Sequence, residues 1–173
     1  MIHIIANWKM NKNKHESVDF FRQFMLFSNT HTLSCSVCIA PPAIYVPLLA
    51  DKFNSISLVA QNISDQDFGA YTGEISASMF SQYVNYAIIG HSEIRNYFNE
   101  TSSIIYQKLL MCFKYDIKPI FCIGENVSQR KSGNYLQIIK NQLKSVVTLS
   151  ENNINNIMIA SAELGGMAVV LTG

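Results

Sequence analysis

The sequence is poor in charge. Charged residues make up 14% of its 173 residues, and the formal net charge is +1. It has neither a basic stripe nor an acidic run, which argues against nucleic acid or another polyanion as a partner. A small anion held by one or two positioned cations remains open. Hydrophobic residues, at 49%, predict a globular domain with a substantial core.

No secretory signal or long membrane-spanning run is evident. Met1 leads directly into a short apolar run, and charged Lys9 follows soon after. The longest uncharged stretch, Leu33 to Ala50, contains three prolines and would make a poor membrane helix. We therefore expect a soluble, cytoplasmic protein that does not bind membranes.

Cysteine is scarce, with four residues in the chain. Cys35 and Cys38 form a C-x-x-C pair, but it leads into a predicted strand, whereas a redox pair usually opens a helix. A zinc site would need a second pair or nearby histidines, and the nearest histidine is His31. We interpret the pair as ordinary thiols and predict no metal site there.

Short apolar runs alternate with helical patterns along the chain. The runs begin at Ile2, Val37, Ser57, Tyr86, Pro119 and Ile157 and are apolar on both faces, as in a buried parallel sheet. Helical spacing of apolar residues predicts helices around residues 18–25, 105–113 and 136–146. Asn13 with Glu16 predicts the start of the first helix. This alternation predicts an α/β fold with parallel strands.

The strand starts lie on average about 31 residues apart, so eight units would need roughly 250 residues, the usual size of a (β/α)8 barrel. The chain holds about five such units and a sixth strand, which predicts an incomplete barrel. Polar residues gather where the strands end, and ligands of parallel α/β folds bind at that edge.

Five strand-end motifs carry a resemblance to a known family, and it covers residues 1–160. In order, they are Ala6-Asn7-Trp8-Lys9-Met10-Asn11, Ala40-Pro41-Pro42, Ala60-Gln61-Asn62 with the loop Gly69 to Glu74, Ile89-Gly90-His91-Ser92-Glu93, and Cys122-Ile123-Gly124-Glu125. Together they resemble the triosephosphate isomerases. The resemblance implies a TIM barrel, no cofactor, and the interconversion of dihydroxyacetone phosphate and glyceraldehyde 3-phosphate through an enediolate.

The resemblance also implies roles for particular residues. His91 would be the neutral electrophile that polarises the substrate carbonyl, Lys9 would give a fixed positive charge, and Asn7 would donate a hydrogen bond. Glu93 and Cys122 would support the site without touching substrate. The alternatives are a core histidine for His91, a solvated loop cation for Lys9, a simple ion pair with Lys9 for Glu93, and packing for Cys122.

The pattern departs from the family after Ala160. The family places Tyr-Glu-Pro-Val-Trp after the sixth strand, and its Glu is the catalytic base; here Ser161-Ala162-Glu163-Leu164 follows. Glu163 comes one position late, and one step along a strand reverses the face of a side chain, so we expect it to point away from His91. We divide the chain into a partial barrel (1–160) and an aberrant tail (161–173), which leaves a catalytically inactive, truncated remnant as the alternative function.

The resemblance further implies a homodimer in which the loop around Thr72 reaches the partner. Ile94 stands where the family usually has the first of two arginines; the second is Arg95. Two geometric expectations complete the analysis. Asn7, Lys9 and His91 should meet at one mouth. The first and sixth strands should both expose unpaired edges, and four isoleucines should lose the opposite wall of the barrel that would bury them: Ile4, Ile39, Ile88 and Ile120.

Overall fold

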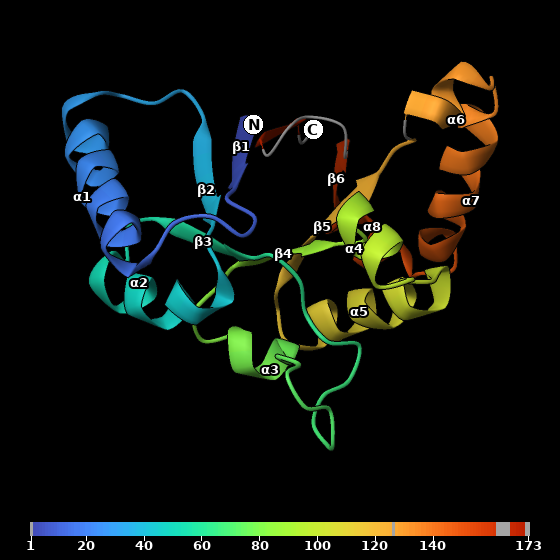
Figure 1. The fold of residues 1–173 in the computed structure, drawn as a ribbon, viewed down its shortest axis with the longest axis horizontal. Helices are drawn as coiled ribbons and strands as arrows, with labels where there is room; N and C mark the ends of the chain where they lie inside the picture. The colour runs from blue at the N-terminus through green and yellow to red at the C-terminus, as the bar shows by residue number, and fades with distance from the viewer. Residues whose placement is uncertain (1, 126, 162–166, 172–173) are drawn as a thin grey trace.

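The computed structural model describes residues 2–125, 127–161 and 167–171. Its centre is a curled sheet with helices on the outside (Figure 1). The strands are β1 (Ile2–Asn7), β2 (Ser36–Ala40), β3 (Ser57–Ala60), β4 (Tyr86–Ile89), β5 (Lys118–Ile123), β6 (Met158–Ser161) and β7 (Met167–Leu171). The first six are parallel and neighbour one another in chain order. The predicted α/β architecture, an incomplete TIM barrel, is confirmed.

Helices follow the strands along the chain. They are α1 (Lys14–Thr30), α2 (Val46–Lys52) after the 3-10 turn η1 (Ala43–Tyr45), α3 (Ala77–Phe80), α4 (Ser92–Tyr97), α5 (Ser102–Lys114), α6 (Val127–Lys131), α7 (Tyr135–Val147) and α8 (Glu151–Asn155). Helix α1 begins at the predicted capping box, because the Asn13 side chain accepts from the Glu16 backbone and the Glu16 carboxylate accepts from the Asn13 backbone. No described helix has the length and apolar character needed to cross a membrane.

Strand β7 was not expected from the sequence. It pairs antiparallel with β1, with Ile2 opposite Leu171 and Ala6 opposite Met167. The predicted free edge of β1 is therefore wrong, because β7 occupies it. Strand β6 remains at one end of the sheet order, and the curl of the sheet brings it near β7 at the other end (Figure 1).

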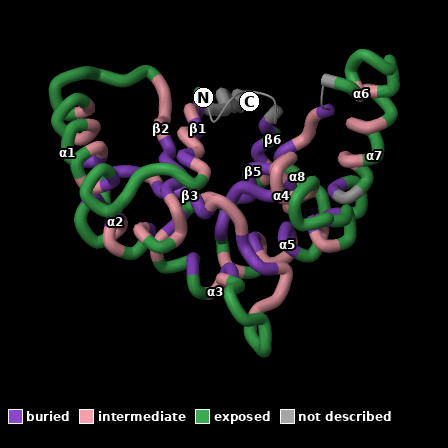
Figure 2. The backbone as a smooth tube through the Cα atoms, viewed as in Figure 1, coloured by how far each residue is buried: buried purple, intermediate pink, exposed green. Residues whose placement is uncertain are grey.

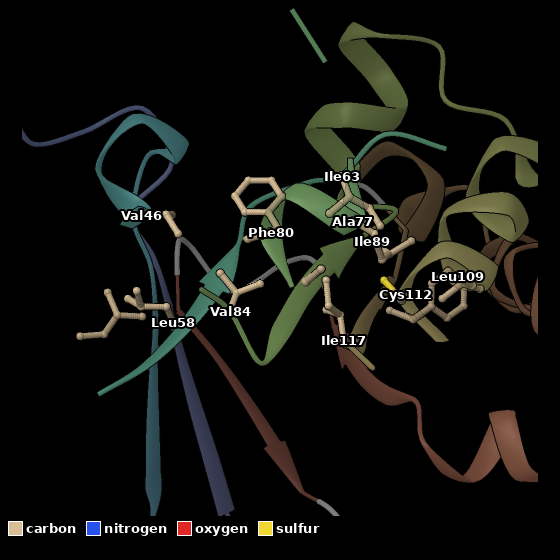
Figure 3. Close-up of a cluster of buried hydrophobic side chains, with 14 of the residues drawn as sticks. Val46, Leu58, Ile63, Ala77, Phe80, Val84, Ile89, Leu109, Cys112 and Ile117 are labelled. Carbon is tan, nitrogen blue, oxygen red and sulfur yellow. The ribbon is translucent and has the colours of Figure 1, made fainter. Parts of the chain in front are cut away.

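Buried side chains form two layers, one on each face of the sheet. Figure 2 marks the buried residues along the backbone, many of them on the strands. The outer layer packs against the helices, and Figure 3 shows part of it, including Phe80 and Leu109. The inner layer contains Ile5, Cys38, Ala40, Val59, Ile88, Ile120, Cys122, Met158 and Ala160.

Two predictions about the isoleucines are wrong. Ile39 belongs to the outer layer, and Ile4 lies on the face of β1 opposite inward-facing Ile5, because side chains alternate along a strand. Ile88 and Ile120 do face inward, yet they are only 4% and 1% exposed. The curl of the sheet packs these inner side chains against one another, so they do not lose their burial.

Candidate active site

The residues singled out at the ends of β1 and β4 lie close together at one end of the curled sheet. We call this place, around Lys9, His91 and Glu93, the mouth. The Lys9 ammonium is 2.7 Å from Glu93 Oε1, although the two residues are 84 positions apart. The other carboxylate oxygen of Glu93 lies 3.7 Å from His91 Nδ1. Glu93 therefore stands between the cation and the imidazole, and the structure brings the three side chains together.

The backbone at Lys9 adopts an unusual conformation. Its φ of 53° lies in the left-handed region, which side-chain-bearing residues seldom adopt. The Asn7 side chain accepts a 2.9 Å hydrogen bond from the Lys9 backbone N–H. The Gln61 side-chain amide donates to the carbonyls of Lys9 and Ala40, at 2.9 Å each. These bonds tie the ends of β1, β2 and β3 together and hold the Lys9 backbone in place.

The geometry of His91 defines its tautomer. His91 is the N-cap of α4, and its Nδ1 accepts a 3.2 Å hydrogen bond from the Glu93 backbone N–H. Nδ1 must then lack a proton, so the neutral ring carries its proton on Nε2. The remaining ring nitrogen is thus a hydrogen-bond donor.

Electrostatics favour the neutral form of this ring. Burial lowers the pKa of His91 below its ordinary value; the Glu93 carboxylate opposes that shift, and the Lys9 ammonium adds to it. The His91 side chain is 14% exposed, whereas those of Lys9 and Glu93 are 34% and 42% exposed. A neutral imidazole still has one N–H to donate to a developing oxyanion, and the pKa of that N–H lies nearer that of an enediol than the pKa of an imidazolium does.

Arg95 links the end of β4 to β5 next to the mouth. Its Nε donates to the carbonyl of Gly90 at 2.7 Å, and its Nη2 donates to the carbonyl of Cys122 at 3.2 Å. Gly90 has a φ of +71°, and a Cβ at that position would lie only 2.6 Å from Arg95 Nη2. The positive φ favours glycine before His91, and a Cβ there would also displace the guanidinium of Arg95.

Cys122 packs under the site. Its side chain is in the inner layer and is 5% exposed. Burial raises the pKa of its thiol to about 12, an effect opposed by Arg95 and reinforced by Glu100. The thiol is therefore protonated near neutral pH, which disfavours a nucleophilic role.

The end of β5 is held from outside the sheet. The Gln142 side chain on α7 accepts from the Gly124 N–H and donates to the Gly124 carbonyl, both at 2.9 Å. The Arg130 guanidinium lies 2.6 Å from Glu125 Oε1 and, as the main cause, lowers the pKa of that carboxyl. These contacts hold the last two residues of the fifth motif, Gly124 and Glu125.

In the sequence, Gln61 stood out only as part of a motif, and Arg95 only as the second of two positions where the family usually has arginines. Their bracing contacts join residues far apart in the chain, which no local pattern could reveal. Among the described residues, no group of three or more His, Cys, Asp or Glu side chains is placed to hold a metal ion. Glu163, the acid nearest the expected base in sequence, lies outside the described residues, so its predicted orientation stays a prediction.

Comparison of the sequence with known proteins identifies a family. The family model described as triosephosphate isomerase matches residues 2–162. Curated triosephosphate isomerases from Porphyromonas gingivalis, Acetivibrio thermocellus and Dictyoglomus thermophilum are 34%, 37% and 39% identical to this chain over 161, 159 and 161 residues. These alignments cover 91%, 90% and 91% of the chain and 64%, 62% and 64% of the respective relatives. The chain thus spans less than two thirds of the length of these relatives. It belongs to the triosephosphate isomerase family.

Proposed function

We propose that the mouth around His91 binds a phosphorylated triose and takes part in the interconversion of dihydroxyacetone phosphate and glyceraldehyde 3-phosphate. The observation that carries this proposal is a partly buried, neutral imidazole with its proton on Nε2, next to a fixed ammonium. Family membership supports the same reaction.

The reaction needs a base, an electrophile and a compensating charge. A base takes the proton from the carbon next to the carbonyl, and negative charge develops on the carbonyl oxygen. The Nε2–H of His91 would donate to that oxygen, and the Lys9 ammonium would stabilise both it and the substrate phosphate. Asn7 holds the Lys9 backbone and would offer its side-chain amide to the same region.

The base of this reaction would be a carboxylate near the end of β6. In the family it is the glutamate that follows the sixth strand. In this chain Glu163 is the acid nearest that point in sequence, one position late. A bulge in the backbone could restore its direction.

The proposed partners follow the family as well. We propose a cytoplasmic homodimer that acts on a small phosphorylated substrate without a cofactor and binds neither nucleic acid nor membrane. The loop of residues 64–75 supports the dimer because it extends away from the sheet beyond α3 and exposes Phe68 and Tyr71 (Figure 1). Its base is closed by a 2.9 Å bond from Ser64 N–H to the Ile75 carbonyl.

The second candidate is a catalytically inactive remnant of the enzyme. It rests on our proposed division of the chain into a partial barrel over residues 1–160 and a divergent tail over residues 161–173. The antiparallel pairing of β7 with β1 favours this candidate, because strands of a (β/α)8 barrel are all parallel. If β7 holds that edge in solution, the barrel cannot place parallel strands there.

A turnover assay on the purified chain separates the two candidates. Isomerisation of either triose phosphate should be measured for the wild type and for His91→Gln. The isomerase proposal predicts turnover that falls by about a hundredfold or more in the variant, because an oxyanion donor is lost. Absence of turnover, together with absence of binding of a phosphorylated enediolate mimic, would leave the remnant.

A further inference from the structure

The short connection between β4 and α4 carries the imidazole of the mouth, and one side chain holds that connection. The register of β4 against β5 ends with Ile89 opposite Phe121. One residue further on, Gly90 leaves the extended conformation with a φ of +71°. Arg95 bridges the two chain segments at this point, since its guanidinium donates to the carbonyls of Gly90 and Cys122.

The side chain and the backbone of Arg95 hold the two peptide groups that flank His91. The carbonyl of Gly90 belongs to the planar peptide that joins Gly90 to His91. Arg95 Nε donates to this carbonyl at 2.7 Å, so the plane of that peptide cannot turn freely. On the other side of His91, the Arg95 backbone N–H donates to the His91 carbonyl at 3.0 Å. Both peptide groups of His91 are therefore bound by the same residue.

The placement of the imidazole depends on these two peptide groups. His91 has a φ of −57° and a ψ of 141°, and α4 begins directly after it. In this conformation the ring folds back so that Nδ1 accepts from the Glu93 backbone N–H. A rotation of either peptide would carry Nδ1 away from Glu93. The ring would then lose the contact that keeps its proton on Nε2.

A guanidinium suits this task better than an ammonium. Its planar fork presents donors in fixed directions, and two of them reach carbonyls that belong to different segments of the chain. The group also lies over the buried Phe121 ring, with 5.8 Å between Cζ and the ring centroid, which limits its own rotation. A Cβ at Gly90 would be 2.6 Å from Arg95 Nη2, so the fork packs directly against the backbone that it holds.

Water is a poor substitute for this guanidinium. Gly90 and Cys122 are both buried, so a carbonyl that lost its donor there would be costly to leave unpaired. Burial lowers the pKa of Arg95, and the nearby Glu100 carboxylate opposes that shift. The guanidinium stays charged because arginine titrates far above neutral pH. A charged donor makes a stronger hydrogen bond to a carbonyl than a neutral one does.

We propose that Arg95 is a positioning residue, which acts through the peptide between Gly90 and His91 to keep the proton of the His91 ring on Nε2. Arg95 does not contact the substrate in this role. Its effect on the ring is independent of any turnover, and only the consequence for catalysis rests on the proposed isomerase function.

The test compares Arg95→Met with Gln142→Leu by nitrogen-15 NMR of the His91 ring, at a pH about 1.5 units above the ordinary histidine pKa, where the ring is neutral. Gln142→Leu is the matched control, because it also removes two hydrogen bonds to the backbone at a strand end, those with Gly124. In Arg95→Met, the Nδ1 resonance should move toward that of a protonated nitrogen. Hydrogen exchange of the Glu93 amide should become about tenfold faster or more. The control should match the wild type in both.

A second variant keeps the proposal testable if Arg95→Met fails to fold. Arg95→Lys keeps the charge but reaches only one carbonyl, so both changes should occur in the same direction and be smaller. An unchanged Nδ1 resonance and an unchanged Glu93 amide in every Arg95 variant that folds would overturn the proposal. The same changes in Gln142→Leu would also overturn it, because they would then report only a loss of stability.

Binding of a phosphorylated enediolate mimic tests the catalytic consequence separately. Arg95→Met should bind the mimic about tenfold more weakly than the wild type or more, because the Nε2–H is no longer aimed at the oxyanion, and Gln142→Leu should bind it like the wild type. If the wild type itself does not bind the mimic, the isomerase proposal fails, and the NMR comparison alone decides the role of Arg95.

Discussion

The Lys9–Glu93 pair at the mouth and the Lys108–Glu100 pair differ in their burial. At the mouth, the Lys9–Glu93 pair is partly exposed, so water screens it and can replace either partner. The side chains of Lys108 and Glu100 are only 7% and 2% exposed, and removal of one partner leaves an uncompensated buried charge. The contrast indicates that the mouth can rearrange its charges at little cost in stability, whereas the buried pair contributes to holding the fold together.

The largest expected effect comes from breaking the buried pair. Lys108→Met should destabilise the protein by about 3–5 kcal/mol, because Glu100 would be left charged, buried and unpaired. Urea unfolding measures the loss. Lys114→Met, which breaks the more exposed pair with Asp67, is the control and should cost much less. Equal losses in the two variants would contradict the contrast between buried and exposed pairs.

A smaller loss of stability is expected when the contact between Gly90 and Arg95 is disturbed. Gly90→Ala must adopt a positive φ and displace Arg95, which should cost about 1–3 kcal/mol. Gly133→Ala is a matched control, because Gly133 has a similar φ of +77° but its Cβ would meet no atom within 4 Å. Thermal unfolding of both variants separates the contribution of Arg95 from that of the backbone. If the two variants lose the same stability, the close approach of Arg95 to Gly90 contributes nothing to the loss in Gly90→Ala.

The partly exposed Lys9–Glu93 pair should affect the pKa of His91 more than it affects the stability of the protein. Lys9→Met and Glu93→Gln should each cost about 1 kcal/mol or less. Their effects on His91 should have opposite signs: the pKa rises in Lys9→Met, where a repelling ammonium is lost, and falls in Glu93→Gln, where a stabilising carboxylate is lost. NMR titration of the ring gives both shifts. Shifts of the same sign would show that the pair does not act on His91 as described.

The smallest effect is the pH dependence of stability that His91 itself contributes. Because its folded pKa is lowered, the unfolded chain binds the proton more tightly. The contribution is therefore fully present above the ordinary histidine pKa of about 6.5 and is lost as pH falls through the folded value. Comparison of urea unfolding for the wild type and His91→Gln, from about one pH unit above the ordinary histidine pKa downward into the acid range, should show the steeper decline in the wild type. A flatter wild-type curve would contradict the lowered pKa.

The sequence predicted the parallel strands and the longest helices well. Each of those elements has a local signal, such as the Asn13 cap or the apolar run that begins at Tyr86. Short helices such as α3 and α4 have too few residues for a periodic pattern and were missed. Strand β7 could not be predicted because its identity depends on pairing with β1, at the other end of the chain.

The candidate site was predictable to a similar extent. The strand-end motifs identified His91 and Lys9, and the structure places both against Glu93. The bracing of Lys9 by Gln61 and of Gly90 by Arg95 depends on distances between elements, which the sequence does not encode locally. The burial of the Lys108–Glu100 pair is likewise a property of packing.

The protonation state of the His91 ring is the most direct test of the account. Nitrogen-15 NMR of the ring should be recorded at pH 7, with and without a phosphorylated enediolate mimic. The account predicts a neutral ring with its proton on Nε2 in both samples, and an Nε2–H resonance that moves when the mimic is added. A ring that is positively charged at pH 7, or that carries its proton on Nδ1, would contradict it.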